Sequence, residues 1–163
     1  CTTVRQAIDG MPAILPGAPN SDDSLHVSSS LSALNMRRIK ASRPGGTWRD
    51  WPQELVTACH LKKSGKTYPA VYGRMEWDKP SPTITGQCYG YGNGRFGHPD
   101  QNRAISLREA AILQSFPRHY KFWPSGETVS FSSVGLMIGN AVPPKLAEAI
   151  GYAIIKHTQE HLA

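Results

Sequence analysis

Cysteine and histidine are the side chains that could carry chemistry in this sequence, and none of them stands in a catalytic pattern. The 163 residues include three cysteines and six histidines. Cys59 directly precedes His60, but neighbours in sequence rarely face each other, and a nucleophilic cysteine needs a facing base or a helix N-terminus that lowers its pKa. Cys88 has no base beside it. We therefore expect both thiols to be inert and predict no self-sufficient catalytic site, so no catalytic residue is assigned.

Metal ligation is not predicted either. His157 and His161 stand four residues apart, but one such pair near a chain end is typical of solvated polar surface. Cys1, Cys59 and Cys88 are too scattered for a zinc site or a disulfide framework. No phosphate-binding loop and no apolar run long enough to cross a bilayer are present.

Positive charge is concentrated in the first half of the chain. The formal net charge is +6, and residues 37–74 contain nine bases against only Asp50 and Glu54. The nine bases are Arg37, Arg38, Lys40, Arg43, Arg49, Lys62, Lys63, Lys66 and Arg74. A local excess of this kind is what neutralisation of DNA phosphates requires, although a solvated basic face would have the same composition.

Four segments have the pattern of helices. A short turn is expected at residues 4–8 and a helix at 28–40, behind a serine N-cap. Ser106 and Glu109 form a capping box that predicts a helix at 106–116. The last helix, at 143–160, begins at two prolines and carries a wide apolar stripe. Because nothing else in the chain offers a surface for that stripe, we expect a partner domain outside this chain.

The middle of the chain predicts strands and loops. Alternation from Tyr68 and the β-branched residues 82–85 indicate a small, loop-rich β region over residues 65–105. The five glycines between residues 86 and 97 would let a backbone approach a ligand, or would form a flexible surface loop. Trp48 and Trp51 are expected in a core rather than as platforms for stacked bases.

Two runs resemble conserved motifs of the cytosine-C5 DNA methyltransferases. Residues 103–117, RAISLREAAILQSFP, resemble the ninth motif of that family, and residues 138–144, IGNAVPP, resemble the tenth. Residues 72–85, YGRMEWDKPSPTIT, are similar to the end of its target-recognition region. The resemblance implies an enzyme that flips a cytosine out of double-stranded DNA and methylates its C5 with S-adenosylmethionine.

The resemblance also implies roles for individual residues. The tenth motif would line the S-adenosylmethionine pocket through Asn140, Ala141 and Val142, where Ala141 replaces a common serine and leaves only backbone contacts. Thr83 would contact a backbone phosphate, Arg103 would be a buried organiser, and residues 86–97 would form a recognition loop. The DNA-binding set implied in this way is Arg74, Thr83, Gly86, Gln87, Tyr89, Arg95 and Arg103.

Several motifs of the family are missing from the sequence. No cysteine follows a proline, and the glycine-rich cofactor motif, the Glu-Asn-Val motif and the Gln-x-Arg-x-Arg motif are absent. We therefore expect the C-terminal part of such an enzyme, inactive alone, with an incomplete cofactor pocket. The expected fold is α+β: a connector at 1–30 from the absent catalytic domain, a β target-recognition region at 31–102, and helices at 103–163 that complete a Rossmann-like domain missing from this chain.

Two other functions fit the same residues. The chain could be the small specificity subunit of a split methyltransferase, or a DNA-binding module without enzymatic activity. The expected partners are double-stranded DNA and the catalytic half, with a homodimer or swapped assembly when that half is absent. We expect a cytoplasmic, DNA-associated protein of restriction-modification or regulation, without membrane contact.

Overall fold

Helices and loops, without a sheet, build the part of the chain that the computed structural model describes, which is residues 1–124, 127 and 130–161. The α-helices are α1 (Val4–Ile8), α2 (Ala33–Ala41), α3 (Ala58–Leu61), α4 (Leu107–Leu113), α5 (Phe131–Asn140) and α6 (Pro144–His161). Short 3-10 turns lie at η1 (Trp48–Asp50), η2 (Gln53–Leu55), η3 (Gly65–Thr67) and η4 (Tyr91–Asn93).

The predicted β recognition region is wrong, and with it the α+β fold class. Within residues 65–105, all of them described, only isolated bridges form, which join Arg74 to Pro44 and Gly97, and Gly97 to Ala104. A ladder needs N–H donors at alternate residues along one edge of a strand, and Pro80 and Pro82, which stand two residues apart beside the expected strand, have none. Single backbone hydrogen bonds join the extended segments, such as that from the Met75 N–H to the carbonyl oxygen of Gly97 at 2.9 Å, but they do not extend into a ladder.

The helices agree better with the sequence. α4 and α6 lie where helices are predicted, and the capping box at Ser106 is present with both of its hydrogen bonds. α2 begins after Ser32 rather than at Ser28, because the Ser32 hydroxyl accepts the N–H of Asn35 while Ser28 is buried. α5 was not predicted as a helix; its N-cap is Ser130.

Two clusters of buried side chains form the interior. The main core packs α1, α4 and α5 together and contains Val4, Met75, Ile105, Val134 and Ile138 among others. A second cluster, the aromatic core, is formed by Ile39, Trp48, Trp51, Leu55, Tyr91 and Ala104. Trp48 and Trp51 are only 7% and 6% exposed, which confirms that these indoles are core residues.

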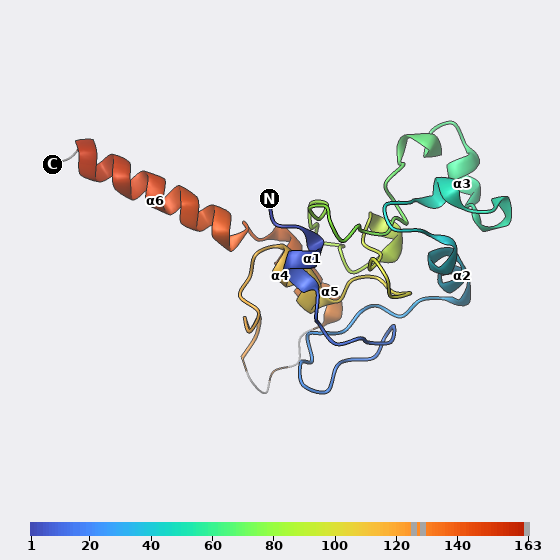
Figure 1. Cartoon of the computed structure of the whole chain (residues 1–163), viewed down its shortest axis with the longest axis horizontal. Coiled ribbons are helices and arrows are strands. Elements are labelled where there is room, and N and C mark those ends of the chain that lie inside the picture. Colours follow the sequence, from blue (N-terminus) through green and yellow to red (C-terminus); the bar gives the residue numbers. More distant parts are fainter. Residues whose placement is uncertain (125–126, 128–129, 162–163) are drawn as a thin grey trace.

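Helix α6 stands apart from both cores. It projects from the body at the end of the molecule opposite α2 and α3 (Figure 1), and none of its described residues is buried. Leu146, Ile150 and Ile154 are 51%, 49% and 60% exposed, so its apolar stripe has no partner within the described residues. No helix in the described ranges is both long and apolar enough to cross a membrane.

Candidate functional site

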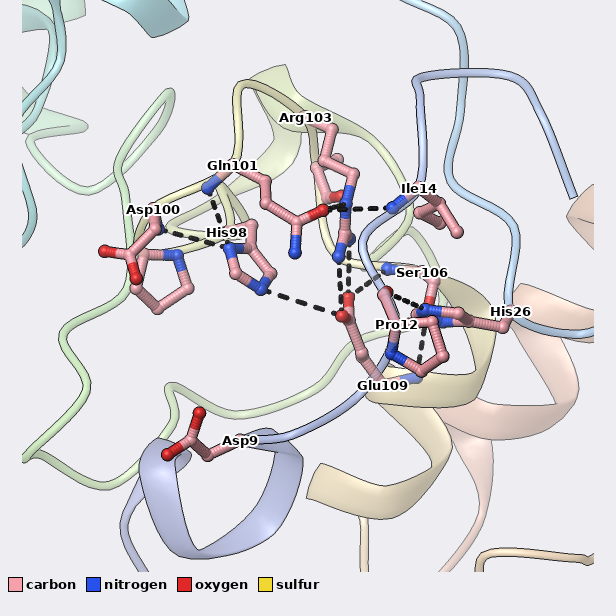
Figure 2. A network of polar contacts seen from close by, with 12 residues as sticks. Asp9, Pro12, Ile14, His26, His98, Asp100, Gln101, Arg103, Ser106 and Glu109 are labelled. Carbon is pink, nitrogen blue, oxygen red and sulfur yellow. Dashed lines mark hydrogen bonds and ion pairs between the residues drawn. The ribbon is translucent and has the colours of Figure 1, made fainter. Parts of the chain in front are cut away.

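A buried ion pair organises the start of α4. The guanidinium of Arg103 donates two hydrogen bonds of 2.7 Å to the two carboxylate oxygens of Glu109, and both side chains are fully buried. Glu109 also accepts the backbone N–H of Ser106 at 2.7 Å, and the Ser106 hydroxyl accepts the N–H of Glu109 at 3.0 Å. Figure 2 shows Glu109 between Arg103, Ser106 and His98. This carboxylate therefore fixes both the helix start and the segment before it.

Two titratable side chains in this cluster, Glu109 and His98, have pKa values below their usual range. Burial alone would raise the pKa of Glu109, but the hydrogen bonds and charge of Arg103 outweigh it and hold that pKa below its usual range. The Nδ1 atom of His98 accepts the N–H groups of Asp100 and Gln101 at 3.1 and 3.0 Å, so its proton lies on Nε2, 3.7 Å from Glu109. Burial lowers the pKa of His98 to about 4, so this imidazole is neutral at physiological pH.

The same cluster holds the N-terminal segment. His26 Nε2 donates to the carbonyl oxygen of Pro12 at 2.8 Å, and its Nδ1 lies 2.8 Å from the Ser106 hydroxyl. The side-chain oxygen of Gln101 accepts both the N–H of Ile14 and the Nε–H of Arg103. Segments far apart in the sequence therefore converge on the start of α4 (Figure 2).

Arg74 is a second buried guanidinium, and it bonds to oxygen atoms that carry no formal charge. Its side chain donates to acceptors at the end of α2 and in the turn at 98–102. These acceptors are the carbonyl oxygens of Ile39 (2.8 Å), Ser42 (2.9 Å), His98 (2.8 Å) and Gln101 (2.8 Å) and the side-chain oxygen of Asn102 (2.5 Å). Burial lowers its pKa. Arg74 therefore ties the aromatic core to the segment that leads into α4.

Two glycines let α5 lie against the segment that precedes the glycine-rich loop and against the loop itself. A Cβ on Gly139 would lie 2.1 Å from the carbonyl carbon of Thr85, and one on Gly135 would lie 2.2 Å from the ring of Tyr89. The two glycines are four residues apart and share one face of α5. A Cβ on Gly86 would lie 3.4 Å from the side-chain oxygen of Asn140. The end of α5 and residues 85–86 are thus in direct contact.

The two residues that follow α4 hold the turn after α5. The Gln114 side chain donates to the carbonyl oxygen of Ala141 at 3.0 Å, and the Ser115 hydroxyl accepts the N–H of Lys145 at 3.1 Å. Asn140 and Val142 are exposed, while Ala141 is half-buried. Three cavities were found beside the residues around Arg108, Phe116 and Pro80. Asn140, Ala141 and Val142 are not among the residues that line them. In this chain they could form one wall of a cofactor site but not an enclosure.

The structure brings together only some of the predicted DNA-binding residues. Thr83 and Gln87 are exposed and lie in the segment that includes Gly86, beside Asn140. Tyr89 is half-buried against Phe131. Arg95 is half-buried, and its Nε has no hydrogen-bond partner among the described residues.

Two of those predicted residues lie elsewhere. Arg74 and Arg103 are 4% and 0% exposed, inside the hydrogen-bond networks above, so neither offers a surface to DNA in this structure. Much of the glycine-rich loop is also interior, since Cys88, Tyr91 and Phe96 are core residues. The contact made by α5 was missed, although the Gly135-x-x-x-Gly139 spacing was visible in the sequence.

Cys88 is buried, whereas Cys1 and Cys59 are exposed. Burial raises the pKa of the Cys88 thiol to about 11. Cys59 is exposed with its sulfur 3.1 Å from the Thr57 hydroxyl, while the His60 ring stacks on Trp48. Across the described residues, no group of three or more potential ligands could hold a metal ion.

Comparison with known protein families identifies the family of the chain. The model for C-5 cytosine-specific DNA methylases matches residues 7–156. The chain therefore belongs to the C-5 cytosine-specific DNA methylase family.

Individual relatives cover the chain to different extents. The Type II methylase M.HgiDII of Herpetosiphon aurantiacus is 57% identical over 152 residues, which are 93% of this chain and 43% of that protein. DNA (cytosine-5)-methyltransferase 3 of Arabidopsis thaliana is 34% identical, over 91% of this chain and 12% of its own length. The Type II methyltransferase M.AquIB of Picosynechococcus sp. is 38% identical over 101 residues, 58% of this chain and 69% of that protein. This chain thus spans less than half of the first two relatives.

Proposed function

We propose that this chain is the C-terminal, DNA-recognising portion of a DNA (cytosine-5-)-methyltransferase of the type II restriction-modification class. It supplies target recognition and one wall of the S-adenosylmethionine pocket, and methylates C5 of cytosine in double-stranded DNA only together with a catalytic half. The observation that carries this proposal is the contact between Gly139 and Thr85–Gly86. That contact puts the residues proposed for DNA, around Thr83, beside those proposed for the cofactor, around Asn140.

The residues after α5 suit one side of a cofactor site. When bound, S-adenosylmethionine supplies the methyl group. The exposed Asn140 amide can donate and accept hydrogen bonds, and Val142 offers apolar contact. Ala141 has no polar side chain, and its carbonyl oxygen is engaged by Gln114, which holds the turn in place.

An exposed apolar surface provides a place for the catalytic half. It comprises Leu136 and Met137 on α5, Val142 in the turn, and Leu146, Ile150, Ile154 and Ile155 on α6, each between 46% and 61% exposed. Exposed apolar side chains gathered in this number are typical of an interaction site. The relative M.HgiDII has more than half of its length outside the matched region, which leaves a segment large enough to cover it.

A methyl-transfer assay tests the proposal. The isolated chain, incubated with duplex DNA and S-adenosylmethionine labelled in the methyl group, should give no turnover. Addition of the unmatched portion of M.HgiDII should restore methylation, and the Asn140→Ala substitution should then raise the KM for S-adenosylmethionine while the affinity for DNA stays the same. Robust turnover by the isolated chain would overturn the proposal, and so would a failure of the unmatched portion to bind it.

A natural split enzyme is the second candidate. It is favoured by M.AquIB, a relative of which this chain covers 69%, so the matched region makes up most of that whole protein. In that case the chain is a small specificity subunit, and the catalytic cysteine lies on a separate polypeptide. Sequencing the gene upstream of Cys1 separates the two candidates, because an in-frame Pro-Cys motif excludes the split enzyme.

A further inference from the structure

A lysine-rich excursion leaves the aromatic core between Thr57 and Ala70. Lys62, Lys63 and Lys66 are all exposed on it, and the sequence has no acidic residue between Glu54 and Glu76. Within the described residues, no carboxylate lies within 4.0 Å of any of the three ammonium groups. The excursion is therefore a concentrated, uncompensated positive charge.

The excursion is held in place rather than free. The Trp48 indole N–H donates to the carbonyl oxygen of Tyr68 at 2.9 Å, and the Arg49 guanidinium donates to that of Lys66 at 2.9 Å. The His60 ring stacks on Trp48 with 4.4 Å between ring centroids. At its tip, a Cβ on Gly65 would lie 1.9 Å from the carbonyl oxygen of Cys59, so the turn closes only with glycine there. The lysines are thus carried on a fixed backbone.

Three of the other six bases of the basic segment are engaged by neighbouring groups, Arg49 donates to the carbonyl oxygen of Lys66, and Arg37 and Lys40 are exposed on α2. Arg38 is buried, donates to the carbonyl oxygen of Leu55 and lies over the rings of Trp51 and Tyr72. Arg43 pairs with Asp50 at 3.1 Å, and Arg74 is enclosed by oxygen atoms. Lys62, Lys63 and Lys66 therefore group closely in the sequence without a carboxylate partner among the described residues, and the segment around α3 that carries them lies at the end of the molecule opposite α6 (Figure 1).

We propose that this excursion binds the phosphate backbone of duplex DNA. Lys62, Lys63 and Lys66 neutralise phosphates, and Tyr68, which is 66% exposed beside them, lies against the adjoining sugar. Such contacts set the position of a protein on DNA without reading its sequence, so base reading stays with the segment around Gln87. The proposal rests on the proposed function, because that function makes duplex DNA, rather than an acidic protein, the polyanion that the chain meets.

A salt titration of DNA binding tests this surface. A labelled duplex of about 20 base pairs is titrated with the 163-residue chain across a series of KCl concentrations, by fluorescence anisotropy. The triple variant Lys62→Gln, Lys63→Gln, Lys66→Gln removes three exposed charges that make no hydrogen bond among the described residues. The matched control is Lys121→Gln, Lys145→Gln, Lys156→Gln, which removes the same charge elsewhere.

The expected result is a change in the salt dependence. The slope of log K against log salt should fall in magnitude by about 2 to 3 in the triple variant, which lowers the affinity on the order of 10²-fold at roughly 0.1 M salt. The control should keep the slope of the parent chain. An equal loss in both triple variants, an unchanged slope, or no binding by the parent chain at low salt would overturn the inference.

Two further readouts separate the possible failures. Poly-glutamate of equal charge should compete poorly with the duplex, and equal competition would assign the surface to an acidic protein instead. The methyl-transfer assay with the added catalytic portion reports on the proposed function independently. If methylation persists and the salt slope of the triple variant is unchanged, the phosphate-binding proposal is wrong while the proposed function is retained.

Discussion

At the scale of single residues, buried arginines decide how this chain is held together, and the sequence indicates only one of them. Arg103 comes just before a capping box whose glutamate offers it a partner, so an organising role was predictable from the motif. Arg74 bonds mainly to backbone carbonyl oxygens. Such partners leave no trace in the sequence, because every residue has a carbonyl group. Counting charges therefore placed Arg74 on the surface.

The first prediction concerns that guanidinium. Arg74→Lys keeps the positive charge but replaces a planar fork of five donors by one ammonium, which cannot reach acceptors at the end of α2 and in the 98–102 turn together. The free energy of unfolding should fall by about 2 to 4 kcal/mol, because buried carbonyl oxygens lose their partners. Urea denaturation measures it. The exposed Arg37→Lys, on α2, is the control, and equal midpoints for the two variants would contradict the prediction.

The second prediction concerns pH. Folding lowers the pKa of His98 from 6.5 to about 4, so the unfolded chain binds more protons between these values. The contribution of neutral His98 to the free energy of unfolding is therefore complete above about pH 6.5 and is lost as the pH falls toward 4. The lowered pKa of Glu109 acts in the same direction at lower pH.

A substitution isolates the histidine. His98→Asn keeps an acceptor for the two backbone N–H groups but does not titrate. The free energy of unfolding of the parent should fall by about 2 to 3 kcal/mol between roughly pH 7 and pH 4.5, and that of the variant by clearly less. The control is His119→Asn at an exposed site. A variant with the same pH dependence as the parent would show that His98 is not the responsible group.

At the scale of elements, helices with caps were predictable and extended segments were not. The capping box located α4, and the paired prolines located the start of α6. The strand prediction failed because alternation at 68–75 and β-branched residues at 82–85 describe extended backbone but not its hydrogen-bond partners. The role of α5 was missed because it follows from a contact with residues 85–89, which are distant in the sequence and which Gly135 and Gly139 allow α5 to approach.

The third prediction tests that contact. Gly139→Ala places a Cβ against the backbone of Thr85 and Gly86, which cannot move aside as a side chain could. The variant should lose about 1 to 3 kcal/mol of stability. Gly151→Ala is the matched control, because nothing lies within 4 Å of that Cβ site on α6, and there alanine should only increase helicity. Thermal unfolding followed by circular dichroism measures both, and equal melting temperatures would contradict the close approach.

At the scale of the whole molecule, an aromatic core and a main core are joined by polar side chains, and one long helix stands outside both. The hydrophobic pattern of the sequence indicates that the last helix needs a partner, since its stripe is wide. It could not indicate that Arg74 joins the aromatic core to the segment before α4, because most of the acceptors of Arg74 are backbone carbonyl oxygens. The described residues thus form a body with two buried cores, together with exposed apolar side chains on α5 and α6.

The fourth prediction follows from that surface. The isolated chain should self-associate as its concentration rises, because the apolar stripe of α6 is buried most readily against a second copy. The triple variant Leu146→Gln, Ile150→Gln, Ile154→Gln should remain a monomer, whereas the control Glu148→Gln, Lys156→Gln, which alters α6 without changing net charge, should associate like the parent. Sedimentation equilibrium distinguishes these states. A parent chain that stays monomeric at high concentration would show that α6 does not drive association. If the catalytic half binds the same stripe, adding the unmatched portion of M.HgiDII should dissociate the self-associated parent chain and give a one-to-one complex.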